Sequence, residues 1–419
     1  MNIAIIGGGA AGFFCSIWLK RLLPEASVTI YEAGLKPLSK VALTGGGRCN
    51  LTNSFKYISN LKVAYPRGDQ AIKRAFNLFS PEDTYKFFEK ELRVKLVTQE
   101  DECVFPASQS AMEIVNALID NALQKGVVLK TKHKVAKIEQ GYKIHFSDNT
   151  SAAADFVVVT TGGAPKEEFL SFLKPFDLEI VPPTPSLFTF NLKESASKGI
   201  LSNLQGIVVE NVTLSIPGTN FKSKDTLLIT HWGISGPATL KLSSYASRYL
   251  AENNYHAPLL IRWMEQSEIE DFIKHNQSES SSKQIQNTHP QAISKRLWEY
   301  ILEKAQIRKD ITWREIKNKG LSKLAQTLLN DSYTISSKGE YKEEFVTCGG
   351  VALSNVNLNT LESKRYKGLY FAGEVLDIDA ITGGFNLQAA WSCGYAVANA
   401  IYSAEKESLS APQSGHTQS

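Results

Sequence analysis

With 419 residues, of which 43% are hydrophobic, the chain has the composition of a globular protein and is long enough for two or three domains. Its formal net charge of +4 is too small to indicate a nucleic-acid partner. The five cysteines are widely spaced and contain no CxxC pair, which argues against a disulfide framework and a zinc site and favours a reducing cytoplasm.

The first apolar stretch, residues 4–23, fits neither a secretion signal nor a membrane helix. Only Met1 and Asn2 precede the first apolar residue, Ile3, so the positively charged segment of a signal peptide is missing. The stretch also contains four glycines, whereas a membrane helix needs about 20 apolar residues. We therefore expect no membrane partner.

The same stretch has the order of a dinucleotide-binding unit. A short strand leads into a GxGxxG turn at Gly7, Gly9 and Gly12, an apolar helix runs to Leu23, and a second strand ends on Glu32. Gly9 would let a pyrophosphate approach the backbone at the helix N-terminus. The Glu32 carboxylate would accept hydrogen bonds from the adenosine ribose, which favours FAD or NAD over NADP.

Two further glycine clusters follow. The segment Lys40–Asn53 is expected to run under the pyrophosphate towards the flavin, with Arg48 neutralising phosphate charge and Asn50 bonding the ring edge; a flexible surface loop is the alternative. The apolar run "DFVVVTTGG" at Asp155–Gly163 predicts a parallel strand covered on both faces. The alternating segment before it indicates a β-meander beside the adenine, with Val135 as a backbone contact.

The fourth cluster, at residues 367–401, repeats the order of the N-terminal unit. A strand at Leu369–Ala372 precedes a glycine loop at Thr382–Gly384 and an apolar helix that begins near Asn386. The N-terminus of this helix can face the flavin and stabilise the negative charge of its reduced form. A core helix is the alternative, and both interpretations can hold together.

The middle of the chain, from Pro182 to about Tyr341, changes to alternating strands followed by polar and helical sequence, which indicates an insertion. The segment His275–Pro290 has the composition of a linker. The sequence "GISGP" at Gly233–Pro237 lacks the strand-to-helix context of a serine hydrolase, so we exclude that class.

One part of the insertion is locally basic. The segment from Gln291 to Lys323 contains nine Lys or Arg residues and only four Asp or Glu residues. A flavin-containing protein that binds or modifies RNA is therefore an alternative hypothesis. A solvated helix face is the preferred interpretation, because aromatic residues are not interleaved as a stacking surface requires, and a nucleic-acid partner is disfavoured.

The chain resembles a family of bacterial FAD-dependent oxidoreductases that includes aminoacetone oxidase and a flavin reductase of bile-acid intermediates. The resemblance covers nearly the whole chain and rests on motifs in the same order: "IIGGGAAG", "TGGGRCNLTN", "VFPAS", "THWGISGPATLKLS", "FVTCGGVALSNVN", "NTLESK" and "LYFAGEVLDIDAITGGFNLQAAWSCGY". Family members usually continue after "TGG" with a threonine- and glycine-rich stretch, and here "APKEEFLSFLKPF" follows Gly163 instead.

The resemblance implies an α/β fold: a Rossmann-like FAD-binding domain with a parallel sheet, helices and a β-meander, interrupted by a β-barrel-like and a small helical domain. The expected boundaries are 1–185 and 342–403 for the FAD-binding domain, 186–274 for the β-rich domain, 289–341 for the helical subdomain and 404–419 for a disordered tail.

The motifs and the resemblance together give a set of expected FAD contacts, and they place no catalytic residue. The expected contacts are Gly7, Gly9, Ala10, Ala11, Gly12, Glu32, Ala33, Lys40, Thr44, Gly45, Gly46, Gly47, Arg48, Cys49, Asn50, Leu51, Val135, Thr161, Gly162, Gly163, Gly373, Glu374, Thr382, Gly383, Gly384, Phe385, Asn386, Leu387 and Gln388. The expected activity is hydride transfer between FAD and a small organic substrate, with NAD(P)H as a transient co-substrate or oxygen as acceptor.

Overall fold

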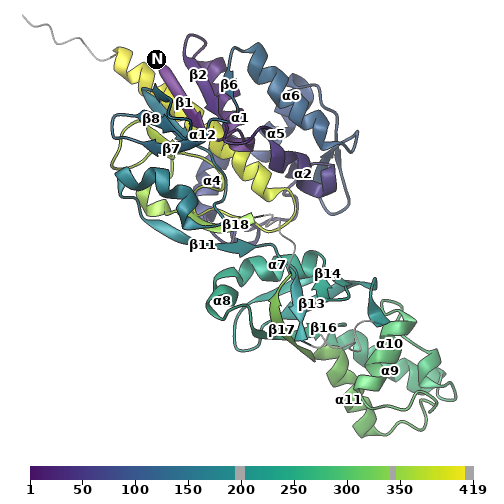
Figure 1. Cartoon of the computed structure of the whole chain (residues 1–419). Helices are drawn as coiled ribbons and strands as arrows, with labels where there is room; N and C mark the ends of the chain where they lie inside the picture. Colours follow the sequence, from purple (N-terminus) through teal and green to yellow (C-terminus); the bar gives the residue numbers. More distant parts are fainter. Residues whose placement is uncertain (194–202, 340–345, 411–419) are drawn as a thin grey trace, which may run out of the picture. The chain divides into compact units, whose positions relative to one another are not determined.

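The computed structural model describes residues 1–193, 203–339 and 346–410, and the chain divides into two compact units. Unit 1 comprises Met1–Thr184 and Val346–Ser419, and unit 2 comprises Pro185–Phe345. Unit 2 is therefore an insertion into unit 1 (Figure 1).

Unit 1 is built on a five-stranded parallel sheet. Ile3 of the central strand lies opposite Phe156 on one side and Val28 on the other. The three valines of the predicted strand within Asp155–Gly163 are fully buried. This confirms the Rossmann-like parallel sheet. In spatial order the strands are β19 (Leu369–Phe371), β10 (Phe156–Val159), β1 (Asn2–Ile6), β2 (Ser27–Tyr31) and β6 (Val128–Lys130).

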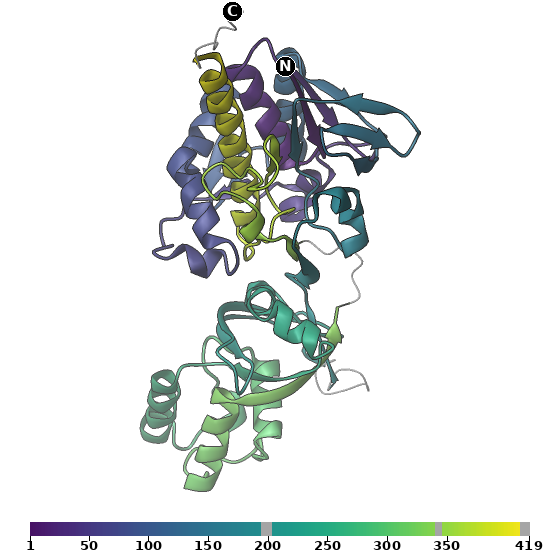
Figure 2. The ribbon, with the colours of Figure 1, turned by 90° about the vertical axis from the view of Figure 1, so that its left-hand side faces the viewer.

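Two long helices of unit 1, one near each end of the chain, pack against each other (Figure 1, Figure 2). A Cβ at Gly394 would lie 2.8 Å from the Ala11 carbonyl oxygen, so only glycine permits this approach. The helices of unit 1 are α1 (Ala10–Leu22), α2 (Ser39–Gly47), α3 (Leu61–Ala64), α4 (Asp69–Leu78), α5 (Pro81–Lys86), α6 (Ala111–Gln124) and α12 (Phe385–Ser410), with a π-turn at Phe87–Glu91 and 3₁₀ segments at Glu167–Phe176 and Leu353–Asn355.

Three small sheets complete unit 1. The predicted meander is an antiparallel sheet of three strands, except that its first segment, β6, joins the parallel sheet. The strands are β3 (Thr52–Asn53), β5 (Cys103–Pro106) and β4 (Leu96–Thr98); β7 (Val135–Ile138), β8 (Lys143–Phe146) and β9 (Ser151–Ala153); and the pair β11 (Ile180–Ser186) and β18 (Val346–Val351).

Unit 2 contains a closed antiparallel barrel of six strands, which confirms the expected β-barrel. Around the barrel the strands are β12 (Phe190–Leu192), β15 (Gly233–Ser235), β14 (Lys222–Ile229), β13 (Val208–Ser215), β16 (Ala257–Arg262) and β17 (Asp331–Lys338). Its helices are α7 (Pro237–Tyr245), α8 (Ser247–Glu252), α9 (Gln266–Glu279), α10 (Lys295–Lys304) and α11 (Asn318–Leu329), with a 3₁₀ turn at Ile285–Asn287.

The helical part of unit 2 differs from its expected boundaries. It is inserted between β16 and β17, so the last barrel strand falls inside the range 289–341 that was expected to be helical. The hypothesis of a linker at His275–Pro290 is wrong, because Ile285 is fully buried and its carbonyl accepts a hydrogen bond of 2.8 Å from the Trp298 indole. The polar composition of this segment hid the one apolar residue, Ile285, that packs into the core.

The C-terminal helix also extends beyond its expected end. Helix α12 continues to Ser410, whereas a disordered tail was expected from residue 404. Residues 411–419 lie outside the described part of the chain. Among the described helices, none has the length and apolar character needed to cross a membrane.

Candidate functional site

The turn between β1 and α1 has the close packing that its glycines predict. A Cβ added to Gly7 would lie 2.5 Å from the carbonyl oxygen of Thr160. A Cβ added to Gly12 would lie 2.2 Å from the carbonyl oxygen of Gly7. At Gly9 the nearest atom to such a Cβ is the Thr160 carbonyl oxygen, 4.0 Å away. Gly7 and Gly12 are thus required by the fold, whereas Gly9 leaves open space in front of the helix.

The N-terminus of α1 is available to an anion. Gly9 is the N-cap residue and supplies no side-chain hydrogen bond, and the first turn contains no acidic residue. The free N–H groups and the partial positive charge of the helix end therefore face the open space beside Gly9.

The Glu32 carboxylate lies directly beside this turn. One of its oxygens accepts a hydrogen bond from the Gly8 N–H (2.7 Å) and the other accepts one from the Gly34 N–H (2.6 Å). These bonds fix the carboxylate at the end of β2, and each oxygen keeps a lone pair for a ribose hydroxyl. The expected role of Glu32 is compatible with this geometry.

The second glycine cluster forms a kinked helix end. Gly46 and Gly47 have φ values of 68° and 82°, and a Cβ at either residue would meet no atom within 4 Å. Their peptide groups are therefore exposed. Arg48 is held beside them by its contact with the Phe105 ring, 4.5 Å from guanidinium carbon to ring centre, and by a 3.1 Å hydrogen bond to the Gly45 carbonyl.

Residues from three glycine clusters meet around Glu374. Its carboxylate lies 3.4 Å from the Lys40 ammonium and accepts a hydrogen bond of 2.8 Å from the Thr347 N–H. A Cβ at Gly163 would lie 2.6 Å from the same carboxylate, and one at Gly162 would lie 3.9 Å from the Lys40 ammonium. The clusters at Lys40, Gly162 and Glu374, far apart in sequence, therefore line one site.

The Asn50 side chain joins the second cluster to the fourth. In its hydrogen-bonding orientation, the amide oxygen accepts from the Gly384 N–H (3.2 Å) and the nitrogen donates to the Thr52 carbonyl (3.1 Å). Gly384 has φ 85°, and a Cβ there would lie 2.2 Å from the Thr52 carbonyl oxygen. Asn50 retains one N–H and one lone pair for the predicted contact with the flavin.

Two polar side chains at the start of α12 are used within the protein. Asn386 pairs with Ala380 through both its amide oxygen (2.9 Å) and its amide nitrogen (3.0 Å). Gln388 is fully buried, accepts a bond from the Thr52 hydroxyl (2.5 Å) and donates one to Ser392 (3.0 Å). Any ligand contact of these two residues therefore depends mainly on their backbone.

The remaining predicted residues are distributed around these clusters. Gly373, with φ 78°, follows β19 and lies beside α1, because a Cβ there would be 3.2 Å from the Ala11 Cβ. Thr161 and Ala33 are exposed, and Val135 lies in β7 of the small antiparallel sheet.

Sequence reasoning missed residues that hold the site together. The Thr160 hydroxyl donates to the Gly7 carbonyl (2.8 Å), and the Thr347 N–H fixes Glu374. Arg67 forms an ion pair with the fully buried carboxylate of Asp379, in the loop before α12. Thr160 directly precedes the "TGG" motif, which could have indicated it; Arg67 lies in no motif.

The described residues fit an FAD molecule. The uncapped end of α1 and the open space at Gly9 suit a pyrophosphate, Glu32 suits a ribose, and the exposed peptides of Gly46 and Gly47 suit close approach of a flat ring.

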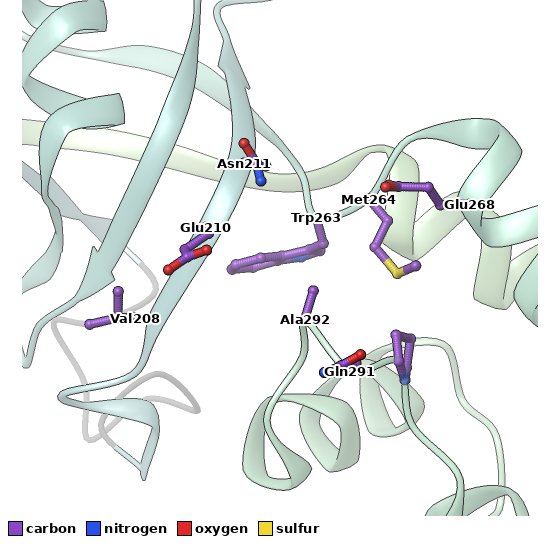
Figure 3. A pocket seen from close by; sticks show the side chains of 9 residues that line it. Val208, Glu210, Asn211, Trp263, Met264, Glu268, Gln291 and Ala292 are labelled. Carbon is purple, nitrogen blue, oxygen red and sulfur yellow. The ribbon is translucent and has the colours of Figure 1, made fainter. Parts of the chain in front are cut away.

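A separate pocket of about 640 Å³ lies within unit 2, between the barrel and the segment that precedes α10 (Figure 3). The Trp263 indole lies in the middle of the view, with Glu210 towards the barrel and Gln291 on the opposite side. The pocket contains no expected FAD contact. It is lined by Val208, Glu210, Asn211, Trp263, Met264, Glu268, Pro290, Gln291 and Ala292.

A family model described as the HI0933-like protein Rossmann domain matches residues 1–400. The ribosomal RNA dihydrouridine synthase of Escherichia coli (strain K12) is 29% identical over 96% of this chain and 98% of its own length. The 3-dehydro-bile acid delta(4,6)-reductase of Clostridium scindens is 26% identical over 94% of this chain and 97% of its own length. A solved 3-ketosteroid-delta4-(5alpha)-dehydrogenase from Rhodococcus jostii RHA1 aligns over 96% of both chains, with 11% identity and a TM-score of 0.48.

Proposed function

The chain belongs to the HI0933-like Rossmann-domain family. We propose that this FAD-dependent oxidoreductase reduces a carbon–carbon double bond that is conjugated with a carbonyl group. The observations that support the redox part are the open, uncapped end of α1 beside Gly9 and the meeting of three glycine clusters around Glu374. When bound, FAD would supply the hydride for the carbon remote from the carbonyl, and a proton would complete the reduction at the neighbouring carbon.

The names of two relatives support this bond type. Dihydrouridine forms when the C5=C6 bond of uracil, conjugated with the C4 carbonyl, gains two hydrogens, and the first relative is named for that product. The second relative is named as a reductase of a 3-oxo bile acid with double bonds at positions 4 and 6. In both substrates the double bond named is conjugated with a carbonyl group.

The residues of the chain have distinct tasks in this proposal. The N-terminal amides of α1 bind the pyrophosphate, and Glu32 orients the adenosine ribose. Lys40 and Glu374 form a polar edge beside Gly162 and Gly163. A transient NADH or NADPH supplies the two electrons that each reduction consumes.

We propose a uridine in ribosomal RNA as the substrate, on the basis of the nearly full-length relative of that name and the basic segment of unit 2. A small enone is the second candidate, favoured by the bile-acid reductase relative. The earlier expectation of a small organic substrate corresponds to this second candidate.

The test is anaerobic. Purified protein, yellow with FAD, is mixed with NADH or NADPH, and the reduced flavin is then mixed with unmodified ribosomal RNA or with a 3-oxo-Δ4 steroid while flavin absorbance is followed. Reoxidation by RNA with a gain of two hydrogens on a uridine, measured by mass spectrometry, supports the proposal. Reoxidation by the steroid alone selects the second candidate, and a protein that binds no FAD contradicts both.

A further inference from the structure

Basic residues gather in sequence around the start of α11 in unit 2, and none of them is an expected FAD contact. Figure 1 shows where α11 lies in the fold. We define the α11 patch by five exposed residues: Lys283, Arg314, Lys317, Lys319 and Lys323. We propose that the α11 patch binds the phosphate backbone of the substrate RNA. This inference rests on the proposed RNA substrate and names the surface that would hold it.

Backbone contacts bring the patch together. The Trp313 N–H donates to the Lys283 carbonyl (3.2 Å), so Lys283 lies beside the segment that contains Arg314. The N–H of Gly320 donates to the Lys317 carbonyl (2.8 Å) in the first turn of α11. Lys319 and Lys323 are four residues apart on α11 and therefore share one face.

The charges of the patch are not neutralised by nearby carboxylates. Within the described residues, Lys304 pairs with Asp331 and Arg308 pairs with Asp310, but no member of the α11 patch is in an ion pair. The nearby Glu315 carboxylate accepts bonds from the Thr312 N–H and hydroxyl instead (2.7 and 2.8 Å).

The patch also does not serve the stability of α11. Lys317 is the N-cap residue and Lys319 lies in the first turn, where the partial positive charge of the helix end disfavours cations. No acidic residue is present in that turn. Cations at an unfavourable helix end, exposed and without carboxylate partners, match a polyanion that comes from outside the protein.

The unit 2 pocket is not an alternative route for the phosphates. Glu210 and Glu268 line it, and their charges repel a polyanion. The α11 patch instead places five basic residues on and beside the loop that carries Arg314 and on the first turns of α11, next to the exposed carboxylate of Glu315, so the positive charges are in excess.

The test compares two variants of the FAD-loaded full chain. The patch variant is Arg314→Gln, Lys317→Gln, Lys319→Gln and Lys323→Gln. The control variant is Lys62→Gln, Lys73→Gln, Lys90→Gln and Lys95→Gln, which removes four exposed charges from unit 1. Fluorescence anisotropy with a labelled single-stranded RNA of 20 nucleotides gives Kd at several salt concentrations.

We expect the patch variant to bind RNA about 10- to 100-fold more weakly and to have a salt slope smaller by up to about 3, since each phosphate contact contributes about 0.7. The control should stay within about threefold of wild type. Equal losses in both variants, or wild-type binding to anionic lipid vesicles and not to RNA, would overturn the inference.

Further readouts separate this inference from the proposed function. Flavin absorbance, Tm and the rate of flavin reduction by NADPH should be unchanged in the patch variant, which excludes misfolding. Wild-type protein that binds RNA through the patch but leaves its uridines unreduced contradicts the proposed substrate and not the surface. RNA reduction that is equally fast in the patch variant contradicts the surface and not the substrate.

Discussion

Gly9 and Gly12 belong to one motif but have different surroundings. A Cβ at Gly9 meets only the Thr160 carbonyl oxygen at 4.0 Å, so Gly9→Val should fold normally and obstruct the pyrophosphate. We expect FAD affinity to fall about 10- to 100-fold, through loss of one or two charge-assisted hydrogen bonds, while the Tm of the FAD-free protein stays unchanged. Fluorescence titration with FAD and thermal unfolding measure the two quantities.

Gly12→Ala is the matched variant within the same turn. Its Cβ would overlap the Gly7 carbonyl oxygen at 2.2 Å, so we expect a loss of about 1–3 kcal/mol in the FAD-free protein. Equal stability losses at Gly9 and Gly12 would show that the space in front of α1 is already filled.

Glu32 has two structural bonds besides its expected ribose contact. Glu32→Gln keeps one acceptor oxygen and places an NH₂ group against either the Gly8 or the Gly34 N–H. We therefore expect the FAD-free protein to lose about 1–2 kcal/mol and FAD to bind more weakly by about 1–3 kcal/mol. Denaturant unfolding without FAD measures the first effect, and FAD titration measures the second. An unchanged FAD affinity would remove Glu32 from the site.

The five cysteines are all buried, and this makes them unreactive in the native protein. Burial raises the pKa of the Cys49 thiol to about 12 and that of Cys393 to about 11, so both remain protonated at neutral pH. We expect a thiol reagent at pH 8 to label none of them before unfolding and all five afterwards. Fast labelling of Cys49 in the native protein would contradict this expectation.

At the scale of single residues, the sequence predicted the glycines well and their polar supports poorly. Gly7 and Gly384 have positive φ and close backbone neighbours, and a glycine within a motif indicates such a conformation. Asn386 and Gln388 were expected to contact FAD, but their side chains bond Ala380, Thr52 and Ser392. The bond between Gln388 and Thr52 joins residues 336 positions apart, so no local pattern encodes it.

At the scale of elements, α12 can be tested as a source of charge stabilisation. Asn386→Asp adds a negative charge in the first turn and loses the bond from the amide nitrogen to the Ala380 carbonyl. We expect a lower stability by about 1 kcal/mol and a flavin potential lower by roughly 10–40 mV, because the added charge disfavours the reduced anion. Spectroelectrochemical titration of the FAD-loaded protein measures the potential.

Asn399→Asp provides the control on the same helix. It adds the same charge 13 residues further on, about 20 Å along the axis, where the effect on a flavin at the other end should be screened. Equal shifts in both variants would mean that the charge acts non-specifically, and no shift in a stable Asn386→Asp protein would mean that the start of α12 does not face the flavin.

Helices and strands with long apolar runs were predicted correctly. The prediction failed where one buried side chain fixes an otherwise polar segment. The parallel strands β1 and β10 were expected from their apolar runs. The segment 275–290 looked like a linker, but Ile285 is buried and Trp313 donates to the Thr288 hydroxyl. Strand β17 was assigned to a helical region because its pairing partners, β12 and β16, lie far back in the sequence.

At the scale of the whole molecule, unit 2 is inserted with its own core. Its buried cluster contains only residues between Phe188 and Ile335, all of which belong to unit 2. The chain leaves unit 1 through β11 and returns through β18, and these strands are neighbours, since a Cβ at Gly349 would lie 2.6 Å from the Pro182 carbonyl oxygen.

We therefore expect that unit 1 folds without unit 2. Replacement of residues 185–345 by a short Gly/Ser linker should give a yellow protein that unfolds cooperatively and binds FAD within about tenfold of the full chain, because every expected FAD contact belongs to unit 1. The same protein should lose RNA binding, since the α11 patch is absent. A colourless or insoluble product, with full-length protein as the control, would mean that unit 2 residues complete the FAD site or the fold of unit 1.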